Sequence, residues 1–190
     1  LKLRPDEAGA RSNLGAALVK LGRYEEAIEE YLKAEKLLPG DARIGMNLAL
    51  AYEKSGRVRQ ASKKLAALHD EAPQDRRITM LLADCDLQLG EYDRVIELLQ
   101  PLARDGPSDL VTDYMLGTAL IRTRRIAEGQ VLLDRILRNG DNAEARFLLG
   151  TQFFESGDYP AAVKELAGAI ELNPGLPQLQ SFYGLALLNT

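Results

Sequence analysis

The sequence predicts an all-α protein in which antiparallel helix pairs stack as a solenoid, and three observations support this fold class. First, a column of small residues recurs every 33 or 34 positions along the 190-residue chain. Second, each period contains two stretches whose apolar residues follow helical spacing. Third, in most periods a glycine separates the two stretches and a proline lies near the end. The small column consists of Gly15, Ala49, Ala83, Gly117, Gly150 and Gly184.

These periods predict one continuous array, treated as a single domain over residues 1–190. The expected boundaries are a partial repeat at 1–7, full repeats at 8–41, 42–75, 76–109, 110–142 and 143–176, and an unpaired first helix at 177–190. A helix pair of about 34 residues cannot bury both of its apolar faces alone, so neighbouring repeats must stack.

The first full repeat, 8–41, shows why two helices are expected in each period. Its apolar faces consist of Leu14, Ala17, Leu18 and Leu21 in the first helix and of Ala27, Tyr31, Ala34 and Leu38 in the second. Gly22 follows the first helix, where a left-handed residue commonly ends a helix, and Pro39 stops the second. The repeat is therefore predicted to be a helical hairpin.

Two repeats depart from this pattern. Repeat 110–142 has Arg124 where the others have glycine, Gly129 inside its second helix and Asp141 in place of the closing proline, so it is predicted to be the least regular. In repeat 76–109, Pro101 falls inside the second helix and should kink or shorten it.

Two neighbouring residues of repeat 76–109 also differ from the residues at the same positions of the other repeats. Asp86 stands where the other repeats have leucine, tyrosine or phenylalanine, so its carboxylate needs a donor, with Arg59 or Arg94 as candidates. Cys85 stands in a column of alanines, where a free cysteine serves as a small apolar residue.

Composition excludes several kinds of function. The chain is 46% hydrophobic and 27% charged with a net charge of −4, and it has no basic run for nucleic acid. One histidine, His69, and one cysteine cannot supply a metal site, and no cofactor-binding or catalytic motif occurs. We therefore expect no metal, no cofactor and no catalytic residue, and thus no enzyme.

Targeting signals are also missing. No apolar stretch is long enough to insert into a membrane. The start, Leu1 to Pro5, is neither a signal peptide nor an initiator methionine, so the chain is expected to be an excerpt. The compartment therefore stays open, with the cytoplasm as the default.

The motifs resemble those of the tetratricopeptide repeat (TPR) family. Segments 20–27 and 38–39 follow the family pattern closely, and segments 156–159 and 172–174 follow it nearly as well. The resemblance implies a right-handed superhelix whose first helices line a concave groove. Carried over by position, the expected partner-binding residues are Asn13, Arg43, Met46, Asn47, Arg77, Met80, Asp84, Tyr114, Met115, Thr118, Phe147 and Thr151.

These residues change character along the chain. The early ones are polar or basic and the later ones apolar or aromatic, which favours an extended peptide with an acidic part and an apolar part. Asn13 and Asn47 resemble two rungs of the asparagine ladder in the TPR array of O-GlcNAc transferase, but Leu81 breaks the ladder. The carboxylate clamp of chaperone-binding TPRs is matched only in part.

Three functions follow from the resemblance and stay open. The leading one is a non-catalytic scaffold that binds a peptide or protein segment in the groove. The second is a regulatory or substrate-recruiting region of a larger enzyme, such as a glycosyltransferase-like protein. The third is self-assembly, because the last helix would expose apolar surface unless a second copy or a further repeat covers it. The residues that would be exposed are Leu179, Phe182, Tyr183, Leu187 and Leu188.

Overall fold

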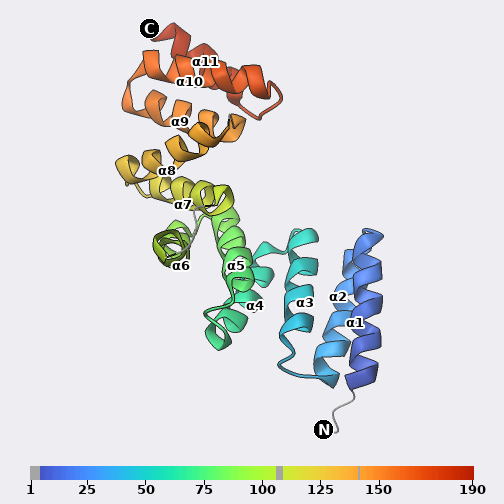
Figure 1. Ribbon diagram of the computed structural model, residues 1–190. Coiled ribbons are helices and arrows are strands. Elements are labelled where there is room, and N and C mark those ends of the chain that lie inside the picture. The colour runs from blue at the N-terminus through green and yellow to red at the C-terminus, as the bar shows by residue number, and fades with distance from the viewer. Residues whose placement is uncertain (1–4, 106–108, 141) are drawn as a thin grey trace. The chain divides into compact units, whose positions relative to one another are not determined.

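The computed structural model describes residues 5–105, 109–140 and 142–190, and these residues form eleven α-helices and no strand (Figure 1). The fold is the predicted all-α solenoid of helix pairs. The chain divides into two compact units, Leu1–Arg94 and Val95–Thr190, with the boundary inside α6. Each unit is described by itself.

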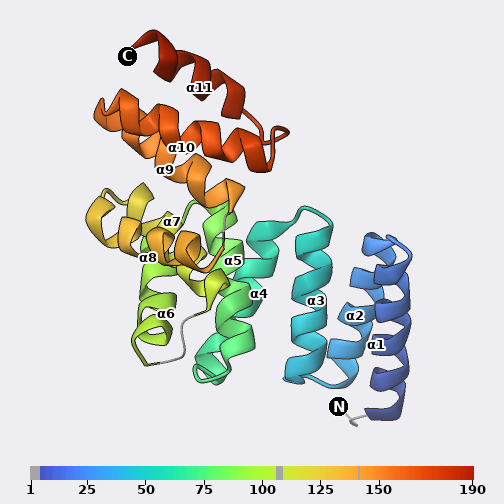
Figure 2. The same cartoon turned by 45° about the horizontal axis from the view of Figure 1, so that its top comes forward.

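Unit 1 contains two complete helix pairs, the first helix of the third pair and the beginning of that pair's second helix. Its helices are α1 (Pro5–Lys20), α2 (Tyr24–Leu37), α3 (Ala42–Lys54), α4 (Val58–Glu71), α5 (Arg76–Leu89) and the start of α6 (Tyr92–Asp105). Within this unit α1 lies beside α2, and α4 packs against both α3 and α5 (Figures 1 and 2).

Unit 2 contains the rest of α6, two helix pairs and a final helix. Its helices are α7 (Leu110–Arg122), α8 (Ile126–Asn139), α9 (Ala143–Ser156), α10 (Tyr159–Leu172) and α11 (Leu179–Leu188). The helices α9 and α10 lie side by side, and α11 packs on α10 (Figure 2). The predicted partial repeat at 1–7 lies largely outside the described residues, and we keep the repeat boundaries as a proposed division.

Side-chain caps start the first helix of four successive repeats. In each case the side chain of the residue before the helix accepts a hydrogen bond from a backbone N–H of its first turn. These residues are Asp41, Asp75, Asp109 and Asn142. Such caps satisfy donors that the helix itself leaves without partners. The chain therefore marks the start of α3, α5, α7 and α9 with the same local device.

The turn inside each helix pair requires a left-handed backbone. Gly22, Gly56, Gly90 and Gly157 adopt φ values of 72°, 80°, 77° and 84°. Arg124 occupies the equivalent place in repeat 110–142 and adopts φ 66°, so the turn is preserved with a residue that rarely takes this conformation.

The core is shared between each pair and the first helix of the next pair. In unit 1, Ile28 and Tyr31 of α2 belong to one buried cluster with Leu48 of α3. In unit 2, Leu133 and Ile136 of α8 cluster with Leu149 of α9. Neighbouring pairs thus stabilise one another, as the repeat pattern predicts.

The structure corrects the predicted apolar face of α1. Leu14 and Leu21 were expected to pack, but they are 50% and 70% exposed. Leu48, at the register of Leu14 one repeat later, is 1% exposed because α2 packs on it. No helix among the described residues covers Leu14 in the same way.

Repeat 110–142 is more regular than its sequence predicts. Both α7 and α8 form at full length. A Cβ atom at Gly129 would lie 2.8 Å from the Gly117 carbonyl oxygen and 2.7 Å from a carbon of Ile121. Glycine is therefore needed there for close approach of the two helices, which compensates its low helix propensity. Asp141 lies outside the described residues.

The expectation that Pro101 shortens its helix is wrong. The helix α6 runs through Pro101 to Asp105. The apolar face of this helix, which includes the fully buried Val95 and Leu99, holds it in place despite the missing N–H.

Candidate partner-binding surface

The predicted binding residues of unit 1 lie on α1, α3 and α5. Asn13, Arg43 and Arg77 are exposed, whereas Met46, Asn47, Met80 and Asp84 are half-buried. Arg43 and Arg77 occupy the same register on α3 and α5, and so do Met46 and Met80. This unit therefore repeats an arginine beside a partly accessible methionine in two successive first helices.

Each of these arginines folds back onto the aspartate that caps its own helix. The Arg77 Nη2 atom lies 3.0 Å from Asp75 Oδ2, and Arg43 Nη2 lies 3.5 Å from Asp41 Oδ2. The hydrogen bonds from Arg77 lower the pKa of Asp75, and the Ile44 N–H is the main cause of the lowered pKa of Asp41. The guanidinium groups are thus held at the helix starts while staying open to solvent.

Asp84 and Asp86 have different environments although they are two residues apart. Asp84 accepts a hydrogen bond from Gln88 Nε2 at 2.9 Å near the surface. Asp86 is fully buried, accepts the Ser62 hydroxyl at 2.6 Å and lies 3.4 Å from Arg94. The predicted pairing with Arg94 is confirmed, and the two carboxylates do not act together.

Cys85 is buried as predicted. Burial, together with Asp84 and other nearby acids, raises the pKa of its thiol to about 12. A thiol that stays protonated is a poor nucleophile, so packing is the role of this residue.

The predicted residues of unit 2 lie on α7 and α9 and are less accessible. Met115 is only 4% exposed, so its side chain does not face solvent as expected, and we leave it out of the proposed binding surface. Phe147 is half-buried and meets Phe182 of α11 edge to face, with ring centroids 5.9 Å apart. Tyr114 is half-buried, and burial is the main cause of the raised pKa of its phenol.

Two threonines on this face direct their hydroxyl protons inward. The Thr118 hydroxyl donates to the Tyr114 carbonyl at 2.7 Å, and the Thr151 hydroxyl donates to the Leu148 carbonyl at 2.9 Å. Each hydroxyl oxygen keeps acceptor capacity toward solvent. A ligand on this face would therefore meet acceptors at these two positions.

Two pockets of unit 2 contain residues that the site prediction missed. An apolar pocket of about 330 Å³ is lined by Leu110, Val111, Tyr114, Ile136, Gly140 and Asn142. A polar pocket of about 190 Å³ is lined by Ile121, Arg122, Arg124, Leu148, Thr151, Gln152 and Glu155. The repeat period could have identified two of these residues. Val111 lies 34 positions after Arg77, and Arg122 lies at the position that Lys20 and Lys54 occupy in the first two repeats.

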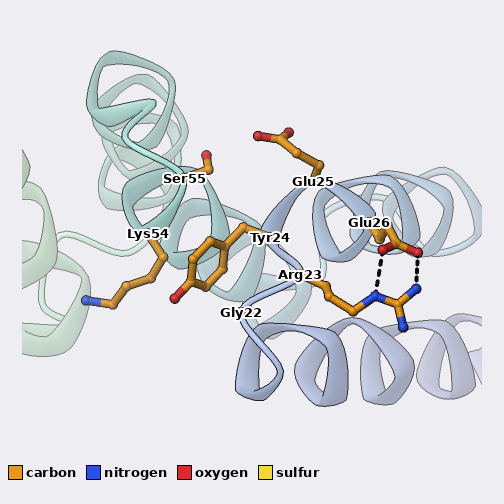
Figure 3. A pocket seen from close by; sticks show the side chains of 7 residues that line it. All are labelled: Gly22, Arg23, Tyr24, Glu25, Glu26, Lys54 and Ser55. Atoms are coloured by element: carbon orange, nitrogen blue, oxygen red, sulfur yellow. Dashed lines mark hydrogen bonds and ion pairs between the residues drawn. The ribbon is translucent and has the colours of Figure 1, made fainter.

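A third, charged pocket of about 410 Å³ lies in unit 1 at the turn between α1 and α2 (Figure 3). Its Arg23 guanidinium donates two hydrogen bonds to Glu26, at 2.6 and 2.5 Å. This pair raises the pKa of Arg23 and lowers that of Glu26. In Figure 3 the Glu25 side chain points away from that pair, so the two acids do not converge on one point.

Metal and membrane sites find no support in the described part of the chain. Residues 5–105, 109–140 and 142–190 contain no group of three or more histidine, cysteine or acidic side chains that could hold a metal ion. Within the same ranges, every helix is too short or too polar to cross a bilayer.

Stacked helix pairs with shared cores and open first-helix faces define the class of helical-repeat proteins. Three family models match this chain: one described as TPR repeat over residues 15–56 and two described as tetratricopeptide repeat over 54–112 and 114–177. The chain belongs to the TPR family. Proteins with these repeats are generally non-catalytic scaffolds that bind protein partners.

Solved structures agree with this fold. A TPR protein of Thermus thermophilus is 23% identical, covers 95% of this chain and 99% of its own, and has a TM-score of 0.64. The MamA protein of Desulfovibrio magneticus, from residue 41 to its end, is 16% identical with coverages of 90% and 98% and a TM-score of 0.80. A comparison with curated protein sequences finds no match.

Proposed function

We propose that the chain is a non-catalytic scaffold that binds an extended segment of a protein partner on the faces of its first helices. The observation that carries this proposal is the repeated arrangement on α3 and α5. Arg43 and Arg77 are exposed at one register, and the half-buried Met46 and Met80 follow at another. Methionine side chains adapt to varied partners, and the neighbouring arginines add charged hydrogen-bond donors, so this combination suits a binding surface.

The chemistry of unit 1 favours an acidic part in the partner. A partner carboxylate can accept charge-assisted hydrogen bonds from Arg43 or Arg77, in competition with the capping aspartates. Asn47 directly follows Met46 on α3 and is half-buried. Its amide group can form hydrogen bonds with a peptide backbone. The half-buried Tyr114 and Phe147 on the first helices of unit 2 favour an apolar part in a partner of that unit.

Site-specific photo-crosslinking in a lysate of the source organism tests the binding face. A benzophenone amino acid would replace Met46 in one sample and Lys63, which is exposed on α4, in the other. We expect protein adducts at position 46 that disappear when Asn47→Ala and Arg77→Ala are added, and none of these adducts at position 63. Equal adducts at both positions would contradict the assignment to the first-helix face.

Self-association is a second candidate because α11 exposes Leu185, Leu187 and Leu188, although Leu179, which was expected to be exposed, is buried. Contiguous exposed leucines are typical of a contact surface. Light scattering over a range of protein concentrations tests it: a mass that rises with concentration and returns to the monomer value in Leu188→Ser would favour assembly. The remaining alternative, a regulatory or substrate-recruiting region of a larger enzyme, would require a catalytic domain outside residues 1–190.

A further inference from the structure

One face of α7 carries the apolar and the polar pocket described above, at opposite ends of the helix. Val111, Tyr114, Thr118 and Arg122 follow one another at spacings of three or four residues, so they lie on the same face. The apolar pocket includes Val111 and Tyr114, and the polar pocket includes Arg122. The helix α9 adds Thr151 and Glu155 to the polar end.

The apolar pocket has the properties of a socket for one large apolar side chain. None of the residues that line it is charged, and Leu110 and Val111 are 48% and 59% exposed at its rim. Ile136, which is almost fully buried, also lines it. Its volume of about 330 Å³ lies at the lower end of the roughly 300–1,000 Å³ typical of ligand pockets.

The polar pocket is lined by two arginines. Arg122 and Arg124 are exposed, and neither forms an ion pair with any residue that the structure describes. Glu155 is the one acid that lines this pocket among the described residues. An acidic group is therefore the complementary ligand.

The backbone of Arg124 supports a role for its side chain. The other four turns of this kind use glycine, with φ between 72° and 84°. Arg124 adopts φ 66° at the same place, which a residue with a Cβ atom takes only at an energetic cost. A cost of this kind, at a residue that lines a pocket, points to a function for the guanidinium.

The surface between the two pockets suits an extended backbone. The Thr118 hydroxyl proton is already donated to a carbonyl of its own helix, so between the pockets this side chain offers an acceptor. Thr151 offers a second acceptor at the edge of the polar pocket, because its hydroxyl proton is also donated within its own helix. Backbone N–H groups of an extended segment are matching donors.

We infer that the α7–α9 face of unit 2 binds an extended segment carrying a large apolar side chain and, about four residues away, an aspartate or glutamate. The apolar side chain enters the Val111–Tyr114 pocket, and the carboxylate pairs with Arg122 and Arg124. The spacing follows from the helix geometry: Tyr114 and Arg122 are eight positions apart, which is a rise of roughly 12 Å, and an extended chain covers this distance in about four residues. This inference rests on the proposed function, since it specifies the partner segment for one unit.

Selection from a random dodecapeptide library displayed on phage tests the inference, with the full chain as bait. We expect enriched peptides to carry a large apolar residue with an acid three to five positions away. A synthetic peptide of the enriched sequence should bind the wild-type chain and lose about tenfold in affinity with Arg124→Gly and again with Val111→Asp, as expected for one charge-assisted bond or one blocked socket. Lys164→Ala, which removes an exposed positive charge from α10, is the matched control and should bind as wild type.

The remaining outcomes separate this inference from the proposed function. Enriched peptides without the acid, or equal binding by Arg124→Gly, overturn the inference and leave the unit 1 face to be judged by crosslinking. A library that yields no binder contradicts peptide binding itself. A dimer that dissociates in Arg124→Gly would place a second copy on this face and would also overturn the inference.

Discussion

The carboxylate of Asp86 lies 3.4 Å from the guanidinium of Arg94, from Oδ2 to Nη2, although Asp86 is fully buried. Its other oxygen, Oδ1, accepts the Ser62 hydroxyl at 2.6 Å. These two contacts connect α5 with α4 and with the first turn of α6 inside unit 1. An acid thus takes the place of the apolar residue found at this register in the other repeats.

The first prediction concerns the pH dependence of stability at Asp86. Burial is the main cause that raises the pKa of Asp86, Glu91 adds to it, and Ser62 and Arg94 act in the opposite direction. The folded chain therefore binds this proton more tightly than the unfolded chain, whose aspartate pKa is about 3.9. The contribution of Asp86 to stability is lowest when the group is ionised at neutral pH and rises as the pH falls through the folded pKa.

Urea unfolding at pH 7 and at several lower values down to pH 4 checks this sign. The free energy of unfolding of the wild type should rise relative to that of Asp86→Asn as the pH falls, because asparagine does not titrate. Its amide oxygen can still accept a hydrogen bond from the Ser62 hydroxyl, whereas its NH₂ group cannot accept one from Arg94. A difference that is constant with pH, or that falls, would contradict the prediction.

The second prediction compares two glycines within helices. Gly129→Ala should lower the free energy of unfolding by about 1–3 kcal/mol, because the new methyl group would overlap the backbone of α7. Gly9→Ala should raise it by roughly 0.5–1 kcal/mol, since a Cβ atom added there would have no neighbouring atom within 4 Å and alanine favours the helix. Chemical denaturation of the two variants measures both effects. If both substitutions changed the free energy of unfolding in the same direction, the packing explanation would be refuted.

The third prediction separates stability from binding at the turn of repeat 110–142. Arg124→Gly should stabilise the chain by about 1 kcal/mol, because glycine takes the left-handed conformation without strain. Gly157→Arg, the reverse change at an equivalent turn, should destabilise it by a similar amount. Thermal unfolding of both variants is the measurement, and a destabilised Arg124→Gly would remove the argument that strain is retained for function.

The fourth prediction concerns the unit 1 face. Asn47→Ala combined with Arg77→Ala should weaken partner binding, while the free energy of unfolding stays within the range of ordinary surface substitutions, about ±0.5 kcal/mol. Both side chains are at least partly exposed, and neither belongs to a buried core cluster among the described residues. Unchanged affinity for a partner captured by crosslinking at position 46 would refute the role of these two residues.

The fifth prediction measures how much one helix pair stabilises the next. Leu48→Ala should cost about 3–5 kcal/mol, because Leu48 is fully packed beneath α2. Leu14→Ala, at the same register on α1, should cost well under about 1 kcal/mol because half of this side chain is exposed. Equal losses of unfolding free energy in urea would show that packing by the preceding helix pair does not stabilise Leu48 more than Leu14.

Local patterns were sufficient to predict two helices in each repeat and the turns between them, but not that α6 runs through Pro101. Turn glycines such as Gly22 and Gly90 adopt the left-handed conformation that ends a helix. Cys85 packs as its column of alanines indicated. These features depend on residues close in sequence, where period and backbone preference act directly.

The candidate site was predicted less completely. Arg43 and Arg77 are exposed as expected, but Met115 is buried, and Val111 and Arg122 were not foreseen. Helical spacing shows which residues share a face, but the exposure of each one depends on the side chains of the neighbouring helix. Phe147 is an example, since Phe182 of α11 covers part of its ring.

Repeat spacing therefore determined the fold class, the family and the face on which a partner is expected to bind, because these follow from periodicity along the chain. Tertiary packing decided which residues of that face are accessible, why Gly129 must lack a side chain and which donors reach Asp86. Those outcomes depend on distances of a few ångströms between helices that are far apart in sequence, and periodicity carries no information about such distances.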